Sequence, residues 1–452
     1  MPPVMWYLIT MLVVVLFWFL VLKRPVYEAV FVAFLVLVTV SGTWGQFLSF
    51  VETGISTNLL YSMTAFVAMS IILSETKVID GCIAIILALL GRIPGGAGYV
   101  SVLASSFMGA LSGSGPGNIM ATGSMTIPAM KRSGFPSELA ANIVSNSSYM
   151  GNMIPPSSNI VAALGAFMAL YPDRELTTSQ FWIIMLGISV WFILHRLIMV
   201  FIFCKVYKIK ALPKEEIPDL KTALKEHWKG MLLPVVIMLP FILDYFFKDT
   251  FFTARLGAKG AKYFSSAALL FIAGVATMYG CLIMKDKRQA NPHKMAKMLA
   301  NAVKSIAPTV GVCVFGYMIG ALFATLDVAG GMGAVIQGVS LGKFGMVLFV
   351  CAITCVLGMI IPGSSIVVIF GGVFITALAS VGVDPLLAAG MLPVICGVMC
   401  GITPPLGLGL YAGMSIAGSD FDKTVNNNWW WVATQFIIQV VILMGLLPII
   451  GI

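Results

Sequence analysis

Long apolar runs, separated by short polar or glycine-rich stretches, recur along the whole chain. An apolar run of about 18 residues with few charges is typical of a helix that crosses a lipid bilayer. The pattern predicts about ten crossings, at 4–22, 26–40, 58–74, 138–170, 181–204, 231–246, 265–284, 306–326, 385–416 and 429–447. We therefore expect an all-α polytopic membrane protein embedded in a lipid bilayer.

Two further apolar stretches, 96–131 and 345–380, have centres rich in Gly, Ser and Pro. Lipid offers no water to unpaired backbone groups, so irregular backbone at membrane depth occurs only where protein or a cavity surrounds it. Each stretch is therefore expected to enter and leave the membrane on one side, as a re-entrant hairpin.

Two of the crossings, 136–171 and 385–416, contain a proline pair near the middle. Proline lacks a backbone donor and pushes the preceding residue out of helical geometry. We therefore expect two broken helices, with carbonyls near Ile154 and Thr403 that point into a cavity.

The two halves of the chain share one plan. Residues 134–141 resemble residues 382–389, and the proline pair at 155–156 matches the pair at 404–405 at almost the same separation. The loops that flank one half are charged oppositely to the corresponding loops of the other half, so the two halves are expected to cross the membrane in opposite directions. This predicts an inverted-topology repeat, whose site is reached from each side in turn.

These elements divide the chain into five parts. The expected parts are N-terminal scaffold helices at 1–57, a first repeat at 58–171 with hairpin 96–131 and broken helix 136–171, scaffold helices and a basic cytoplasmic linker at 172–290, a second repeat at 291–418 with hairpin 345–380 and broken helix 385–416, and a C-terminal helix at 419–452. Within the second repeat, 291–306 has apolar and basic faces, so it is expected to lie at the membrane surface.

Composition agrees with this plan. Of 452 residues, 59% are hydrophobic and 10% are charged, and the mean hydropathy is +1.00. The net charge of +9 would suit a nucleic-acid partner, but the basic residues gather in loops beside apolar runs, as the positive-inside rule predicts for cytoplasmic loops. No nucleic acid is therefore expected, and the eight cysteines, which form no CxxC pairs, are expected to be packing residues.

An ionisable residue inside an apolar run is energetically costly unless it is functional or lies near an edge of the membrane. Arg196 and its neighbour His195 sit late in the run 181–204, so Arg196 is expected to extend toward the cytoplasmic surface. No carboxylate lies at the centre of either repeat, which favours an alkali cation over a proton as the coupling ion. No HExxH, Ser/His/Asp or Walker-type pattern is present, so no enzyme is expected.

The residues that could carry chemistry gather at the two hairpin tips and the two helix breaks. Their carbonyl and hydroxyl oxygens, without thiolates or imidazoles, are the ligands that a hard cation such as sodium requires. Helices that restart after each tip also present N-terminal dipoles, which favour a carboxylate. For a single Ser or Gly, close helix packing is an equally good explanation, and the run 146–148 could be either a substrate-facing stripe or an inter-helix seam.

At these residues the chain resembles the large membrane subunit of the tripartite ATP-independent periplasmic (TRAP) transporters. The resemblance covers nearly the whole chain and rests on Ser112-Gly113-Ser114-Gly115, Thr126-Ile127-Pro128-Ala129-Met130-Lys131, Gly134-Phe135, Ile154-Pro155-Pro156, Leu357-Gly358-Met359, Gly401-Ile402-Thr403-Pro404-Pro405 and Ala417-Gly418-Ser419-Asp420. It implies an inverted-repeat secondary transporter of the elevator type in the bacterial inner membrane. It also implies sodium-driven import of a small carboxylate, a periplasmic substrate-binding protein and, for this chain, a separate small TRAP membrane subunit.

From the residues and the resemblance together we expect two sodium ions, one in each repeat, and no other cofactor. The expected cation-binding residues are Ser112, Ser114, Asn152, Pro155 and Ser157 in the first repeat and Gly363, Ser364, Ser365 and Thr403 in the second. The expected substrate-binding residues are Asn118, Asn146 and Ser158. The alternatives are a stand-alone sodium–carboxylate symporter and a membrane enzyme or scaffold that transports nothing.

Overall fold

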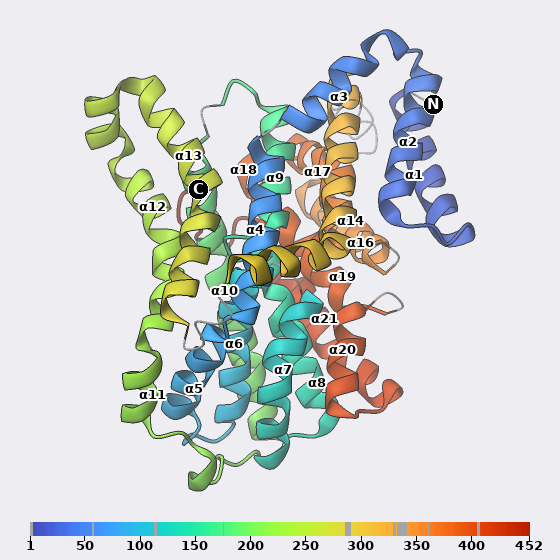
Figure 1. Ribbon diagram of the computed structural model, residues 1–452. Coiled ribbons are helices and arrows are strands. Elements are labelled where there is room, and N and C mark those ends of the chain that lie inside the picture. The colour runs from blue at the N-terminus through green and yellow to red at the C-terminus, as the bar shows by residue number, and fades with distance from the viewer. Residues whose placement is uncertain are drawn as a thin grey trace.

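The computed structural model describes residues 3–56, 58–112, 115–174, 176–284, 291–328, 331, 341–359, 361–404 and 407–452. Every regular element in these residues is helical, which confirms the all-α prediction (Figure 1). Among them, four helical segments are long and apolar enough to cross a membrane, namely Thr178–Val206, Lys214–Phe247, Gly363–Ser380 and Pro385–Ile402. Shorter apolar helices add to these, including Val26–Ser41 and Lys343–Gly358.

The N-terminal helices pack on a long helix from the second half of the chain. They are α1 (Pro3–Leu16), η1 (Phe17–Val21), α2 (Val26–Ser41), η2 (Trp44–Gln46), α3 (Phe47–Ser56) and α4 (Asn58–Glu75). The long helix, α14 (Pro292–Thr325), contacts α2, α3 and α4. The segment 291–306, expected to lie at the membrane surface, is continuous with the rest of α14, because residues 292–306 form its first turns.

The first repeat contains one hairpin and one broken helix, as predicted. After α4, with which the range 58–171 begins, its elements are α5 (Val78–Leu90), the hairpin arms α6 (Gly96–Ser112) and α7 (Gly115–Arg132), and the broken helix made of α8 (Ser137–Ser148), η3 (Tyr149–Asn152) and α9 (Ser158–Leu170). Gly134, with φ 97°, turns the chain between α7 and α8. Only glycine adopts that conformation readily, which explains the residue at this turn.

A group of helices joins the two repeats. They are α10 (Thr178–Val206), η4 (Lys214–Glu216), α11 (Leu220–His227), η5 (Trp228–Leu232), α12 (Leu233–Phe247), η6 (Lys248–Phe252) and α13 (Thr253–Ile283). A capping box starts α10, because the Thr177 side chain accepts from the Gln180 amide and the Gln180 side chain accepts from the Thr177 amide. Arg196 on α10 is wholly buried, so the expectation that it extends toward the surface is wrong.

The second repeat follows the same order. It contains the hairpin arms α16 (Lys343–Gly358) and α17 (Gly363–Ser380) and a broken helix made of α18 (Pro385–Leu392), η8 (Pro393–Val398), α19 (Met399–Ile402) and α20 (Leu408–Ala417). The C-terminal helix, α21 (Phe421–Leu443), follows it. Gly382, with φ 83°, repeats the turn made by Gly134. Asp384 then caps α18, accepting from the amides of Leu386 at 2.8 Å and Leu387 at 3.1 Å.

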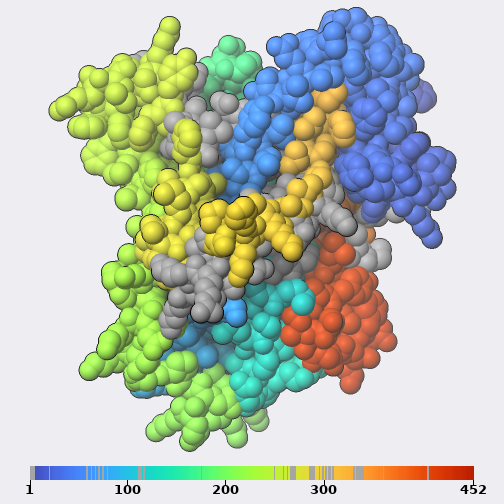
Figure 2. Space-filling model, in the orientation of Figure 1, coloured from blue at the N-terminus to red at the C-terminus, as the bar shows by residue number. Residues whose placement is uncertain are grey.

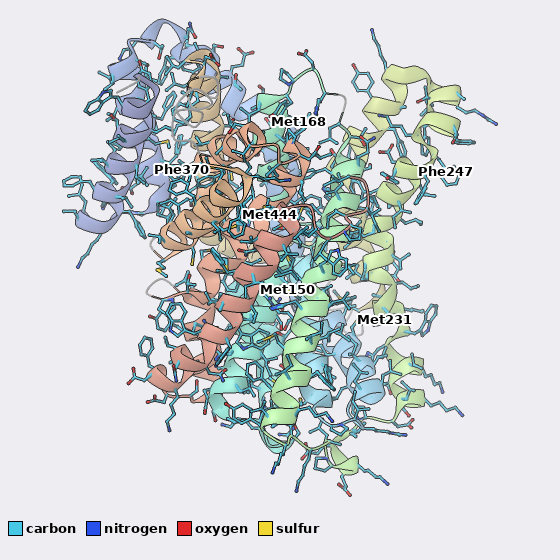
Figure 3. All side chains as sticks on the ribbon, turned by 180° about the vertical axis from the view of Figure 1, so that it is seen from behind. Met150, Met168, Met231, Phe247, Phe370 and Met444 are labelled. Atoms are coloured by element: carbon cyan, nitrogen blue, oxygen red, sulfur yellow. The ribbon has the colours of Figure 1, made fainter. Side chains whose placement is uncertain are left out.

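Elements of the two repeats are interleaved rather than side by side. Helix α8 packs on α20 of the other repeat as well as on α6 and α7, and α17 packs on α9. On the face shown in Figure 2, α4 (blue) and α14 (gold) lie over the upper part, while α7 (teal) and the C-terminal helices (red) reach the surface below. Figure 3 shows the opposite face, where α10 and α21 run past Met150 of the first break.

Candidate functional site

The first hairpin tip lies between the end of α6 and the start of α7. Ser114 lies outside the described residues, as does the side chain of Ser112. Asn118, one turn into α7, is wholly buried, and its Nδ2 donates to the carbonyls of Ser105 at 2.7 Å and Ser148 at 3.1 Å. Asn118 therefore ties both hairpin arms to the end of α8, while its Oδ1 has no hydrogen-bond partner among the described residues.

The first helix break lies between η3 and α9. The backbone is extended at Ser157, with φ −137° and ψ 142°. The Ser157 hydroxyl donates to the Asn152 carbonyl at 2.9 Å and accepts from the Asn159 amide at 3.3 Å, so it closes the break and caps α9. Ser158, the first residue of α9, is half-buried, whereas Pro155 is buried.

The two broken helices meet through these same residues. The Asn152 Nδ2 atom donates to the Gly397 carbonyl in η8 at 2.8 Å. A Cβ atom on Gly397 would lie 2.8 Å from Asn159 Nδ2 and 3.2 Å from Asn152 Cβ, so a side chain there would displace both asparagines. Glycine at 397 thus lets two asparagines of the first repeat approach the backbone of the second.

The second hairpin tip is held against the second broken helix. The Gly363 amide, at the start of α17, donates to Cys400 Sγ at 3.0 Å. A Cβ atom on Gly363 would overlap the Cys396 carbonyl, so this close contact also requires glycine. Ser364 is half-buried and Ser365 is buried.

The second helix break lies at Thr403, where the backbone is extended with φ −99° and ψ 124°. The Thr403 hydroxyl donates to the Met399 carbonyl at 2.8 Å, so its own oxygen can still accept. Its carbonyl accepts from the Gly407 amide at 2.9 Å, and the Ile402 carbonyl accepts from Asn428 Nδ2 at 2.7 Å. Near this break, the Thr403 carbonyl is therefore paired by backbone within the break, and the Ile402 carbonyl is paired by a side chain of α21.

Tyr149 joins three parts of the site that lie far apart in the sequence. Its ring is buried, and added Cβ atoms on Gly115, Gly401 or Gly409 would each run into it. Gly115 opens α7, and the other two glycines lie on either side of the second break. The first hairpin, the first break and the second break therefore share one aromatic ring. An aromatic residue next to a break was the only local signal, and it did not identify the distant glycines.

The polar run 146–148 makes inter-helix hydrogen bonds. Asn146 Nδ2 donates to Asn428 Oδ1 on α21 at 2.9 Å, and the Ser148 hydroxyl lies 3.3 Å from that of Ser105. Asn146 Oδ1 and the Ser147 hydroxyl, both buried, have no hydrogen-bond partner among the described residues. The run therefore joins neighbouring helices through hydrogen bonds, and the Asn146 Oδ1 and Ser147 Oγ atoms can still accept.

The arrangement brings together oxygen atoms, helix N-termini and glycine backbone from both repeats in an apolar interior. Such a site can replace the hydration shell of a hard cation and can accept an anionic group at the positive ends of α7 and α17. It offers no activated nucleophile or acid–base pair among the described residues.

Comparison with known proteins gives relatives along most of the chain. A C4-dicarboxylate TRAP transporter large permease protein, DctM, from Pseudomonas aeruginosa is 25% identical over 358 residues, which are 78% of this chain and 77% of that protein. The 2,3-diketo-L-gulonate TRAP transporter large permease protein YiaN from Escherichia coli is 25% identical over 362 residues, covering 78% of this chain and 76% of that protein.

The fold is also found in a solved structure. The YdaH transporter of Alcanivorax borkumensis, described as having an unusual topology, superposes with a TM-score of 0.58 at 16% identity, covering 88% of this chain and 86% of that one. A family model described as "Tripartite ATP-independent periplasmic transporter, DctM component" matches residues 3–449. The chain therefore belongs to the DctM component family of the TRAP transporters, and it is a multi-pass membrane transport subunit rather than an enzyme.

Proposed function

We propose that the chain is the large permease subunit of a sodium-coupled, binding-protein-dependent importer of a small organic acid. The observation that carries the proposal is the pairing of each hairpin tip with a helix break, with Tyr149 and Asn152 joining the two pairs. A site assembled from both inverted repeats can open to either side if the repeats exchange conformations.

Sodium is the proposed coupling ion, one ion in each repeat. The first ion would be held by Ser112, Ser114, Asn152, Pro155 and Ser157, and the second by Gly363, Ser364, Ser365 and Thr403. Support comes from the extended backbone that interrupts the two helices at Ser157 and Thr403. The hydroxyl and carbonyl oxygens at these positions are hard ligands.

The proposed substrate is a carboxylate, and Asn118, Asn146 and Ser158 are the proposed contacts. Ser158 is half-buried at the N-terminus of α9, where the helix dipole favours a negative charge. Asn118 and Asn146 are buried and would act through side-chain oxygens that accept from substrate hydroxyls or bound water. The named relatives carry C4-dicarboxylates and 2,3-diketo-L-gulonate, which are organic acids.

We further propose an elevator motion in the bacterial inner membrane. The hairpins and broken helices would move as one body against the remaining helices. A separate small membrane subunit would complete the scaffold, and a periplasmic binding protein would deliver substrate.

Uptake by proteoliposomes tests this function. We expect radiolabelled C4-dicarboxylate uptake only with an inward sodium gradient, an added binding protein and the small subunit. Uptake without the binding protein would instead establish the stand-alone symporter. No uptake of any organic acid under a sodium gradient, with all partners present, would contradict the proposal.

A further inference from the structure

The seam between α10 and α21 contains a buried cation that the proposed transport site does not use. Arg196 of α10 has no exposed surface, and neither do Trp431, Gln435 and Gln439 of α21. The three α21 residues are spaced four apart, so they lie on one stripe of that helix. Figure 3 shows α10 and α21 running along the same face of the molecule.

Arg196 is surrounded by neutral partners. One guanidinium nitrogen donates to Gln435 Oε1, the other terminal nitrogen lies 2.6 Å from His195 Nδ1, and the guanidinium carbon lies 5.9 Å from the centre of the Trp431 ring. In the described parts of the chain, no Asp or Glu forms an ion pair with Arg196. A guanidinium does not lose its proton in proteins, so this charge stays in the apolar interior.

Most of the buried polar atoms at this seam that have no hydrogen-bond partner among the described residues are donors. Arg196 Nε, Gln435 Nε2, Trp431 Nε1, His195 Nε2 and the Gln439 amide have no hydrogen-bond partner among the described residues. Gln435 must present its nitrogen, because its oxygen accepts from Arg196, and His195 must carry its proton on Nε2, because Nδ1 accepts from Arg196. Buried donors without acceptors are destabilising, so the seam is complementary to a ligand that brings acceptors.

We propose that the α10–α21 seam binds a small monovalent anion. One negative charge neutralises the single guanidinium, whereas a divalent anion would leave a net charge buried in apolar surroundings. The chemistry fits a halide or a small carboxylate, either of which accepts several N–H donors at once.

The seam also touches both helix breaks. Two turns before Arg196, the Ser189 hydroxyl donates to the Met153 carbonyl at 2.9 Å, and two turns before Gln435, Asn428 donates to the Ile402 carbonyl at 2.7 Å. A bound anion therefore links the two helices that hold the breaks in place. This site is separate from the proposed sodium ligands, and its test does not depend on transport.

Thermal unfolding of the purified full-length chain tests the site. At constant sodium and ionic strength, the anion is varied from the bulky sulfonate HEPES to chloride, acetate or formate. Because a ligand bound only to the folded state raises its stability, we expect a saturable rise in Tm with at least one small anion. The apparent Kd should weaken at least ten-fold in Arg196→Gln, in the charge-preserving Arg196→Lys and in Gln439→Leu.

Arg174→Gln is the matched control, because Arg174 lies over the Tyr171 ring at 5.5 Å but is exposed. It should keep the wild-type response. A response to chloride alone assigns the site to a halide, and a response to acetate or formate alone assigns it to carboxylates such as a substrate. A Tm that is the same in every anion, or a response that Arg196→Lys and Gln439→Leu retain in full, would overturn the proposal.

Discussion

At the scale of single residues, hydroxyl side chains at the helix breaks have two tasks. The hydroxyls of Ser157 and Thr403 each donate to a carbonyl of their own repeat, at 2.9 Å and 2.8 Å. These bonds fix the rotamer and direct the remaining lone pairs of each oxygen. A hydroxyl held in this way can serve as a cation ligand with little further loss of side-chain freedom.

Thr403→Val tests this view, because valine keeps the shape and removes the oxygen. We expect the sodium concentration for half-maximal uptake to rise by about ten-fold, equal to about 1.4 kcal/mol of lost binding. The control is Thr354→Val, since Thr354 in α16 is also buried and donates to its own helix at 2.8 Å. Equal sodium dependence in both variants would remove Thr403 from the cation site.

At the scale of elements, distant segments are joined by side chains that pack against glycines or donate to carbonyls at helix ends. Tyr149 packs on glycines at both ends of the second break, and Asn428 of α21 bonds to Ile402 before it. Each contact joins segments far apart in the sequence. The breaks are therefore stabilised by distant segments as well as by the hydrogen bonds of their own residues.

Gly401→Ala should disrupt this packing, because the added methyl group would run into the Tyr149 ring. Overpacking of a core typically costs about 1–3 kcal/mol, so we expect a lower Tm and impaired uptake. Gly320→Ala in α14, where an added Cβ meets nothing within 4 Å, is the control and should be neutral. If the ring is the cause, Tyr149→Leu should partly rescue Gly401→Ala. A fully stable Gly401→Ala protein would refute this packing.

Asn428→Leu tests the support of the second break from α21. It removes the donor to the Ile402 carbonyl and the acceptor of Asn146 Nδ2, at 2.7 Å and 2.9 Å. Buried groups left without partners cost about 1–3 kcal/mol each, so thermal unfolding should show a clear loss of stability. Asn426→Leu, exposed on the same helix, should leave Tm unchanged. Matching melting curves for the two variants would argue against a supporting role for Asn428.

The sequence predicts the order of helices, hairpins and breaks along the chain, but few of the tertiary contacts between them. Proline pairs, Gly134 and Gly382 are local signals, because proline and positive φ act on the backbone where they occur. Arg196 was misplaced because burial depends on α21, which lies far along the chain. The contacts of Tyr149 with three glycines and of Gly363 with Cys400 likewise depend on tertiary packing that no local pattern encodes.

At the scale of the whole molecule, α14 divides its contacts between two sets of helices. It packs on α2, α3 and α4 of the N-terminal group and also on α17 of the second hairpin. In the proposed elevator, the contact of α14 with α2, α3 and α4 persists, whereas α17 slides along α14. The interface between α14 and α17 is therefore where relative motion can be stopped.

A cysteine pair across that interface provides the test. A Cβ atom on Gly316 of α14 would lie 3.1 Å from Val368 Cβ of α17, slightly closer than the usual disulfide spacing of about 3.5–4.5 Å and within reach of small adjustments. We expect oxidised Gly316→Cys/Val368→Cys to lose uptake and reduction to restore it, with each single variant unaffected by oxidant. Because an elevator cannot run while these helices are joined, full uptake by the quantitatively crosslinked protein would show that α17 does not move against α14.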